Sequence, residues 1–215
     1  MKYLKIKDLK SWKRISCLIA IFGGLFFLIT TIIAMIIYPG GYSFTNYYFS
    51  NLGTSKTVGT SEPNPIASVL FLLACVIAGL SLIPFWVALT SVFSRKPSTK
   101  FLSYIGSILG IISSPLLMAI GIFPGDTAHA EHTFSARFFF LAFAITIMLY
   151  SVAIIINEQY LNIYSYLGII FSIFIVLFLF RIFDLINPLV QKIIVYGFMV
   201  WVLIQITKIW KLDTR

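Results

Sequence analysis

The chain has 215 residues, of which 60% are hydrophobic and 11% charged, and its mean hydropathy is +0.98. A water-soluble domain carries about 25% charged residues, so this composition excludes a soluble globular protein and indicates an integral membrane protein. The net charge of +9 does not indicate a nucleic-acid partner. The charges lie in short segments between long apolar runs, a pattern typical of membrane topology at an anionic lipid surface.

Six apolar segments are long enough to cross a bilayer, which takes about 20 residues. They cover residues 15–38, 64–93, 101–123, 134–156, 164–181 and 189–209. We therefore expect an all-α, polytopic transmembrane helical bundle with six spans, forming one domain over residues 1–215. The first apolar run is too long for a signal peptide and has no small-x-small cleavage site, so we expect it to be a retained span.

Most of the 16 Lys and Arg residues lie before residue 15, between residues 93 and 101, and after residue 207. Cytoplasmic loops are enriched in these residues. The distribution predicts a multi-pass protein of the cell membrane with both termini in the cytoplasm. Cys17 and Cys75 fall inside apolar runs without the spacing of a metal or redox site, and we expect both to be buried.

The first loop on the predicted outer side, about residues 39–63, is rich in Gly, Ser, Thr, Asn and Tyr. A loop of this length in a small protein is more often functional than idle. Its central segment, which contains Ser50 and Asn51, suits a surface or re-entrant helix packed over the bundle. No histidine lies near Ser50 in the sequence, so the sequence does not favour Ser50 as a nucleophile.

The predicted outer side also holds most groups that are capable of acid–base or metal chemistry, namely Glu62, Asp126, His129, Glu131, His132, Arg137, Arg181 and Asp184. The densest part is residues 123–132. There, Asp126 follows a Pro-Gly turn and could cap the helix that enters the fourth span. This concentration of polar groups on one side predicts that the functional site lies there.

If that helix begins at Asp126, then Asp126, His129 and His132 stand at positions i, i+3 and i+6 and share one broad face. Oxygen and nitrogen ligands on one face could hold zinc or another divalent metal. They could equally relay a proton or line a pocket for a headgroup. A further alternative is that they are ordinary polar residues at a helix entry, since the chain has no H-E-x-x-H motif and no cysteine to supply a fourth ligand.

Arg137 lies about 7 Å further along the same helix than His132 and precedes three phenylalanines. An arginine at that depth costs free energy unless it reaches the interface or finds a partner. Asp184, Glu62 and a lipid phosphate are the candidate partners, because guanidinium binds carboxylate and phosphate in a fork. Arg181 and Asp184 are three residues apart, a spacing that predicts a local ion pair.

The segment from Gly106 to Gly110 is a G-x-x-x-G motif, which lets two helices approach closely within a membrane. We favour packing within the chain, with a homo-oligomer formed through these glycines as the alternative. No phosphate-binding loop, dinucleotide fingerprint, CxxC pair or G-x-S-x-G elbow is present in the sequence.

Three short motifs carry a resemblance to a known family. Ser50-Asn51-Leu52-Gly53 follows the first span, Asn64-Pro65 opens the second, and Gly121-Ile122-Phe123-Pro124-Gly125-Asp126 precedes the histidines. From about residue 15 to the sixth span, the chain resembles the bacterial and archaeal membrane family labelled "domain of unknown function 998". It is more distantly similar to DRAM-like six-span proteins, some of which are tied to lipid handling. The resemblance implies a six-helix bundle with polar motifs on the outer side but no agreed activity. The positions that it singles out are Ser50, Asn51, Gly53, Asn64, Pro65, Phe123, Pro124, Asp126 and His132.

Two functions fit these observations. In the first, an outer pocket binds a membrane lipid headgroup or a small polar ligand: Arg137 meets the phosphate, Asp126, His129 and His132 line the mouth, and the first loop forms a lid. In the second, the same three residues hold a metal that activates water in a lipid hydrolase or transferase, with a further ligand from Glu62 or Asp184. Convergence of Glu62 or Asp184 on the histidines would favour the enzyme, and dispersal would favour binding or a structural role. Transport is disfavoured, because the centres of most spans offer only Ser, Thr, Gly and Pro.

Overall fold

The computed structural model describes residues 2–157 and 160–213, and within these ranges its regular structure is helical. The six long helices are α1 (Lys2–Ile36), α2 (Pro65–Thr90), α3 (Pro97–Ile122), α4 (His129–Ile156), α5 (Asn162–Leu179) and α6 (Asn187–Asp213). Three short 3-10 helices lie between them, namely η1 (Phe49–Gly53), η2 (Ser91–Phe93) and η3 (Asp184–Ile186). All six long helices are long and apolar enough to cross a membrane. This confirms the prediction of an all-α bundle with six membrane-spanning helices.

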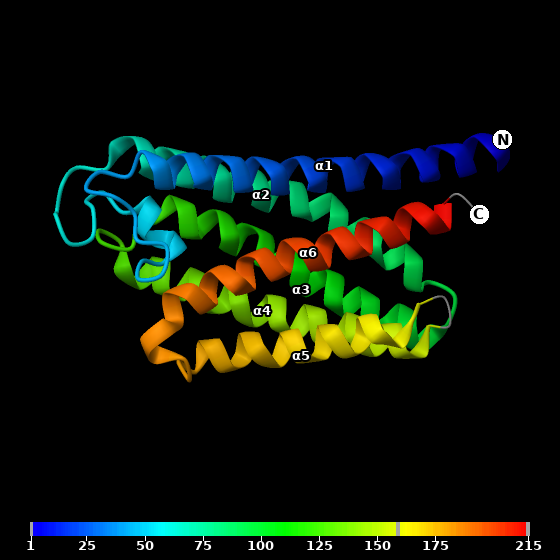
Figure 1. Ribbon diagram of the computed structural model, residues 1–215. Helices are drawn as coiled ribbons and strands as arrows, with labels where there is room; N and C mark the ends of the chain where they lie inside the picture. Colours follow the sequence, from blue (N-terminus) through cyan, green and yellow to red (C-terminus); the bar gives the residue numbers. More distant parts are fainter. Residues whose placement is uncertain (1, 158–159, 214–215) are drawn as a thin grey trace.

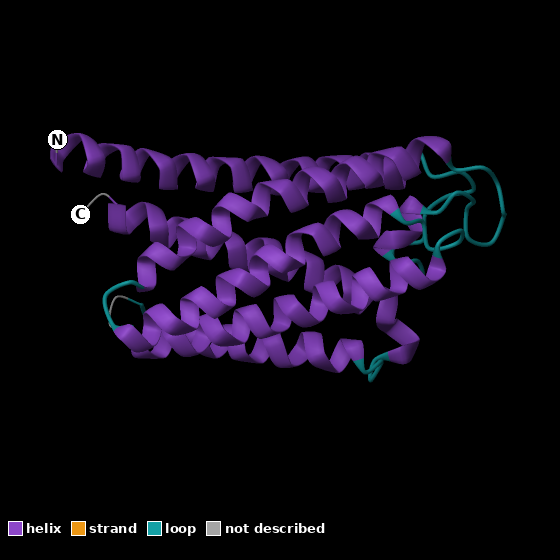
Figure 2. Cartoon of the chain, turned by 180° about the vertical axis from the view of Figure 1, so that it is seen from behind, coloured by secondary structure: helices purple, strands orange, loops and turns teal. Residues whose placement is uncertain are grey.

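The long helices run side by side along the axis of the bundle (Figure 1, Figure 2). Both chain ends lie at one end of the bundle (Figure 1). The loop between α1 and α2 lies at the opposite end, together with the α3–α4 and α5–α6 connections, and we call this end the loop end. The assignment of the loop end to the extracytoplasmic side rests on the distribution of Lys and Arg in the sequence.

Proline and glycine mark several helix boundaries. Pro65 and Pro97 occupy the start of α2 and α3, where proline loses no hydrogen bond and its fixed φ suits a helix. α3 ends just before the Pro124-Gly125 turn, and α4 begins only at His129. This break between α3 and α4 sets the positions of the acidic and histidine side chains at the loop end.

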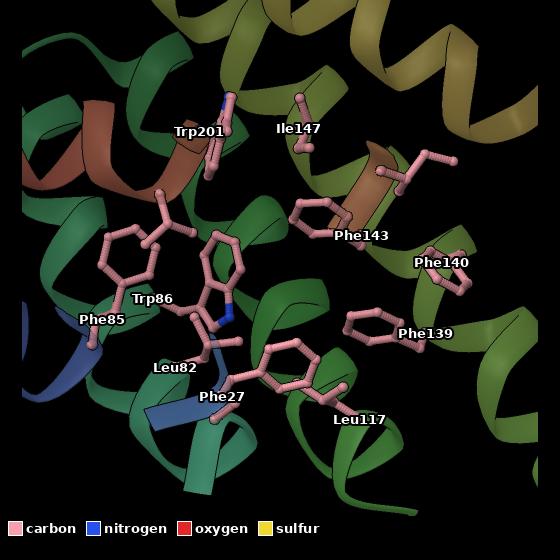
Figure 3. Packing of buried hydrophobic residues seen from close by; sticks show 14 of the residues in the cluster. Phe27, Leu82, Phe85, Trp86, Leu117, Phe139, Phe140, Phe143, Ile147 and Trp201 are labelled. Carbon is pink, nitrogen blue, oxygen red and sulfur yellow. The ribbon is translucent and has the colours of Figure 1, made fainter. Parts of the chain in front are cut away.

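Aromatic side chains fill the middle of the bundle (Figure 3). Trp86 of α2 stacks on Tyr150 of α4 with 6.4 Å between ring centroids, and Trp201 of α6 lies 6.1 Å from Trp86. A Cβ added at Gly110 would come within 2.4 Å of Trp86, and one at Gly106 within 3.0 Å of Tyr150. The G-x-x-x-G motif therefore serves packing within the chain. The two cysteines are buried, as predicted.

Candidate functional site

The loop between α1 and α2 folds over the loop end and is held by its own side chains. Asn51 accepts a hydrogen bond through Oδ1 from the backbone N–H of Tyr48 at 2.6 Å, within the turn of η1. Asn64 donates through Nδ2 to the carbonyl oxygens of Leu52 and Thr54 at 3.0 and 3.1 Å. The expected surface helix is present as the short η1, and Asn51 and Asn64 support the backbone around it.

Asp126 ties this loop to the α3–α4 connection. Its carboxylate accepts hydrogen bonds from the Ser55 hydroxyl at 2.6 Å, the Ser55 N–H at 2.9 Å and the Lys56 N–H at 3.1 Å. Partial burial alone would raise the pKa of the Asp126 carboxyl, but these hydrogen bonds outweigh it and hold the pKa below its usual value. The expectation that Asp126 caps α4 is wrong, because α4 begins at His129 with Ala128 at the N-cap position.

The two histidines occupy different environments. His132 is buried, and its Nδ1 donates to the carbonyl oxygen of Phe123 at 2.8 Å. Because a carbonyl only accepts, this bond places the proton on Nδ1 and leaves Nε2 as an acceptor in the neutral ring. His129 is exposed, with Nδ1 3.3 Å from the carbonyl oxygen of Gly125 and Nε2 3.5 Å from the hydroxyl of Thr133.

The predicted metal ligands do not form a set in this structure. In the parts of the chain that the structure describes, no three His, Cys, Asp or Glu side chains are grouped so that they could hold a metal ion. Asp126 is engaged by the loop, and the helix that would align it with His129 and His132 starts three residues later than expected. Glu62 is exposed in the loop, and neither it nor Asp184 completes a group with the histidines.

Arg181 and Asp184 form the predicted local ion pair. The distance from Nη2 of Arg181 to Oδ1 of Asp184 is 2.7 Å, and Nε donates to the same oxygen at 2.9 Å. α5 ends at Leu179, so the pair bridges a turn and does not lie within a continuing helix. Both side chains are 67% exposed, and a pair in that setting contributes at most about 1 kcal/mol.

Arg137 lies on the outside of α4. It is exposed in one stripe with Phe134, Phe138 and Leu141, about 12 Å along the helix from His129 at ~1.5 Å per residue. It makes no hydrogen bond or ion pair with the described residues, and Asp184 is already paired with Arg181. A phosphate of the surrounding lipid stays a prediction for Arg137.

A small pocket with mostly apolar walls lies beneath the loop, with a volume of about 40 Å³. Its polar lining consists of Ser50, His132 and Gln191, which come from η1, α4 and α6. The Oε1 atom of Gln191 accepts a hydrogen bond from the backbone N–H of Phe49 at 2.9 Å, so its amide N–H groups remain as donors. The fold thus brings Ser50 into the lining of the same pocket as His132, which lies 82 positions away in the sequence.

A larger apolar cavity continues from this pocket toward the middle of the bundle. Its volume is about 140 Å³, and its walls come from α1, α2, α3, α4 and α6. Figure 3 shows Phe27, Leu82, Leu117, Phe139 and Phe143 around this region. Five residues line both spaces, so the small pocket and the larger cavity adjoin; they are Phe27, Leu117, Phe139, Phe140 and Val195.

Lys192, like Gln191, is a residue of this end that the sequence analysis did not single out. It is 1% exposed on α6, and its ammonium group donates to the carbonyl oxygens of Tyr47 and, at 3.3 Å, of Pro188. The rings of Tyr42 and Phe44 lie 5.3 and 5.1 Å from it, within cation–π range. Lys192 therefore holds the loop to α6. A lysine within an apolar span is itself a signal of function or special structure, and that signal was present in the sequence.

Comparison with known proteins gives one match. The model of the family described as "Protein of unknown function (DUF998)" matches residues 21–207. No curated protein and no solved structure matches the chain. The more distant likeness to DRAM-like proteins receives no support from the family match.

Proposed function

The chain belongs to the DUF998 family of proteins of unknown function, and we propose that it binds a membrane lipid. The polar headgroup would occupy the pocket formed by Ser50, His132 and Gln191, and the hydrocarbon chain would occupy the adjoining apolar cavity. The distribution of Lys and Arg supports a position of this site on the extracytoplasmic side of the cell membrane.

One observation carries the proposal: a pocket whose walls include three hydrogen-bonding side chains adjoins an apolar cavity within the same bundle. That sequence of polar and apolar surroundings matches an amphiphile. The walls of the cavity, which has a volume of about 140 Å³, are almost wholly apolar. Water does not occupy such apolar surroundings readily, so a hydrocarbon chain is the filling that suits them.

The loop that covers the pocket is fastened at two places. Asp126 binds it through Ser55 and Lys56, and Lys192 binds it through the carbonyl oxygen of Tyr47. In this proposal the loop is a lid over the headgroup, as the sequence suggested. Asp126 fastens the lid and does not contact the ligand, while Arg137 contacts phosphates of the surrounding lipid from outside the bundle.

A metal-dependent lipid hydrolase or transferase is the weaker candidate. It would need Asp126, His129 and His132 on one ion, but Asp126 is engaged by the loop and the two imidazoles have separate partners. The metal content of the purified protein tests this candidate. Near-stoichiometric zinc, or another transition metal, that disappears in a His129→Ala/His132→Ala double variant would establish it over the binding role.

The lipid-binding proposal is tested by extracting lipids from protein purified in mild detergent and quantifying them by mass spectrometry. We expect one lipid class to be retained near stoichiometrically. Its amount should fall about tenfold in His132→Phe and Ser50→Val, since each removes a hydrogen bond worth roughly 1 kcal/mol and narrows the pocket. Glu62→Gln is the matched control because Glu62 is exposed in the same loop. Equal lipid content in all four proteins would overturn the proposal.

A further inference from the structure

We infer that the bound lipid is a neutral one with a small hydroxyl-bearing headgroup, and that it enters from the bilayer between α1 and α6. This inference rests on the proposed lipid-binding function. It goes beyond that function because it names the ligand class and the route of entry. In this inference the pocket ligand is not the phosphate that the sequence predicted as a partner of Arg137, which lies outside the pocket.

The first argument is charge. The described residues that line the pocket include no Asp, Glu, Lys or Arg. Lys192, adjacent to Gln191 in sequence, does not line the pocket: its ammonium group donates to the carbonyl oxygens of Tyr47 and Pro188 and lies 5.6 Å from the ring of Phe49, which does line it. While His132 is neutral, a charged headgroup placed in the pocket would be buried without a partner of opposite charge, which carries a large desolvation cost. A neutral headgroup avoids that cost.

The second argument is hydrogen bonding. In the neutral ring, Nε2 of His132 is an acceptor, because Nδ1 donates to Phe123. Gln191 offers N–H donors, because its Oε1 is already bonded to Phe49. Ser50 can donate or accept. A ligand hydroxyl both donates and accepts, so it can satisfy all three side chains, whereas an anion could not accept from Nε2 of the neutral histidine.

The third argument is size. The pocket volume of about 40 Å³ corresponds to roughly three water molecules at about 10–15 Å³ each. A hydroxymethyl or glycerol group is of this size. A phosphate that carries a further alcohol is much larger and would require the loop to move away. Long-chain alcohols and monoacylglycerols therefore represent the chemical class that fits.

The route of entry follows from exposure. Leu25 of α1 and Leu203 of α6 both line the apolar cavity, yet they are 52% and 47% exposed on the outside of the bundle. The cavity therefore reaches the surface between these helices, where the membrane lies. A Cβ added at Gly24 would meet Met199 at 3.8 Å, so at this level α1 meets α6 through a flexible methionine that can move aside. The loop covers the other approach, from the end of the bundle.

The ligand class is tested with three photoreactive probes that share one hexadecyl chain and end in an alcohol, a carboxylate or a phosphate. Each probe is added to the protein in nanodiscs at slightly alkaline pH, and covalent labelling is quantified by mass spectrometry. We expect the alcohol probe to label the protein about tenfold more than the phosphate probe does. The reason is that the pocket contains no partner for a buried charge at this pH. Unlabelled monoacylglycerol should compete with the alcohol, and His132→Phe should abolish its labelling.

The outcomes separate the two claims. If the phosphate or carboxylate labels as strongly as the alcohol, and His132→Phe abolishes that labelling, lipid binding stands and the neutral class is wrong. If no probe labels in a His132-dependent way, the proposed function itself fails.

The route is tested with Leu25→Trp and Leu203→Trp, which add bulk at the mouth of the cavity. We expect each to slow labelling by the alcohol probe several-fold relative to the unsubstituted protein. Ile29→Trp and Val200→Trp are matched controls, since Ile29 and Val200 are 55% and 56% exposed on the same helices and do not line the cavity. Labelling rates that do not differ between the two pairs of variants would overturn the lateral route.

Discussion

At the scale of single residues, the carboxylate of Asp126 has a structural role that its neighbours in the sequence do not reveal. Asp126 lies in a turn closed by the Ala128 N–H and the Pro124 carbonyl oxygen at 2.8 Å. Its own carboxylate faces Ser55 and Lys56, about 70 positions earlier in the chain. The carboxylate therefore links the α1–α2 loop to the α3–α4 connection, and its contribution can be measured directly.

We predict that Asp126→Asn loosens the α1–α2 loop without unfolding the bundle. The amide keeps one acceptor oxygen but loses the charge, and the loss should be about 1 kcal/mol because the site is exposed. Amide hydrogen exchange at residues 54–58 should become several-fold faster in the variant. Glu131→Gln is the control, since Glu131 is an exposed acidic residue at the start of α4. Equal exchange in Asp126→Asn and Glu131→Gln would show that Asp126 does not fasten the loop.

The same carboxylate predicts a pH dependence. Its folded-state pKa lies below the ordinary value of 3.8, so its stabilising contribution is fully present above about pH 4 and is lost as the pH falls through the lowered pKa. Loop exchange, corrected for the intrinsic effect of pH, should therefore accelerate on acidification below that range. Asp126→Asn should show no such step. An identical step in the variant would assign the titration to another group.

At the scale of elements, the end of α5 has an arginine at a position that favours glycine. Arg181 has a φ of 57°. The Arg181 N–H donates to the Phe178 carbonyl oxygen at 2.9 Å, and the Ile182 N–H donates to the Leu177 carbonyl oxygen at 3.2 Å. These two bonds form a Schellman motif, whose left-handed residue is usually glycine. The helix stop that the sequence placed at Arg181 thus occurs two residues earlier, at Leu179.

We predict that Arg181→Gly stabilises the protein by up to about 1 kcal/mol, because it removes the cost of a left-handed non-glycine residue. The exposed ion pair with Asp184 that it also removes offsets part of this gain. Arg181→Ala loses the ion pair with Asp184 but keeps the cost of a left-handed non-glycine residue. Its stability should therefore be equal to or lower than that of the unsubstituted protein. The midpoints of thermal unfolding in detergent rank the three proteins by stability. A less stable glycine variant would show that the ion pair outweighs the backbone cost.

The contact of α3 with α2 depends on glycine for a different reason. A Cβ at Gly110 would lie 2.4 Å from the buried ring of Trp86, and a closely packed core does not absorb that overlap. We predict that Gly110→Ala lowers the stability by roughly 1–3 kcal/mol, measured as the midpoint of thermal unfolding. At Gly24 the nearest atom to an added Cβ is Met199 Cε at 3.8 Å, so Gly24→Ala is the control and should retain full stability. If Gly110→Ala left the stability unchanged, the close approach of α3 to Trp86 would be contradicted.

At the scale of the whole molecule, the sequence predicted the fold better than the site. Hydropathy identified all six membrane-spanning helices because each span must be apolar along its length. Hydropathy missed the polar ends of the helices, such as residues 129–133 of α4, because these residues are helical but not apolar. His132 was identified correctly as a residue of the loop end, but the grouping with Asp126 and His129 assumed a helix start that the Pro-Gly turn shifts by three residues.

The convergence of Ser50, His132 and Gln191 is a tertiary property, since these residues lie on three elements whose packing no local pattern encodes. Gln191 and Lys192 were missed for the same reason, although a lysine within an apolar span was visible in the sequence. The charge pattern pointed to the end of the bundle where the proposed site lies. The packing of the helices then divides the polar groups of this end into a carboxylate that holds the loop, side chains that line the pocket, and an outward-facing arginine.

The orientation of the bundle is the whole-molecule property on which the proposed site depends. The excess of Lys and Arg near the termini predicts that the loop end is extracytoplasmic. We expect a single cysteine introduced at Ser61, which is exposed in the α1–α2 loop, to react with a membrane-impermeant maleimide in intact cells. A cysteine introduced at exposed Ser94, in the α2–α3 connection, should react only after the cells are opened. Cys17 and Cys75 are buried and should remain unlabelled in the folded protein, so they need not be replaced. The reverse pattern of reactivity would place the pocket on the cytoplasmic side, where the lipid would be drawn from the inner leaflet.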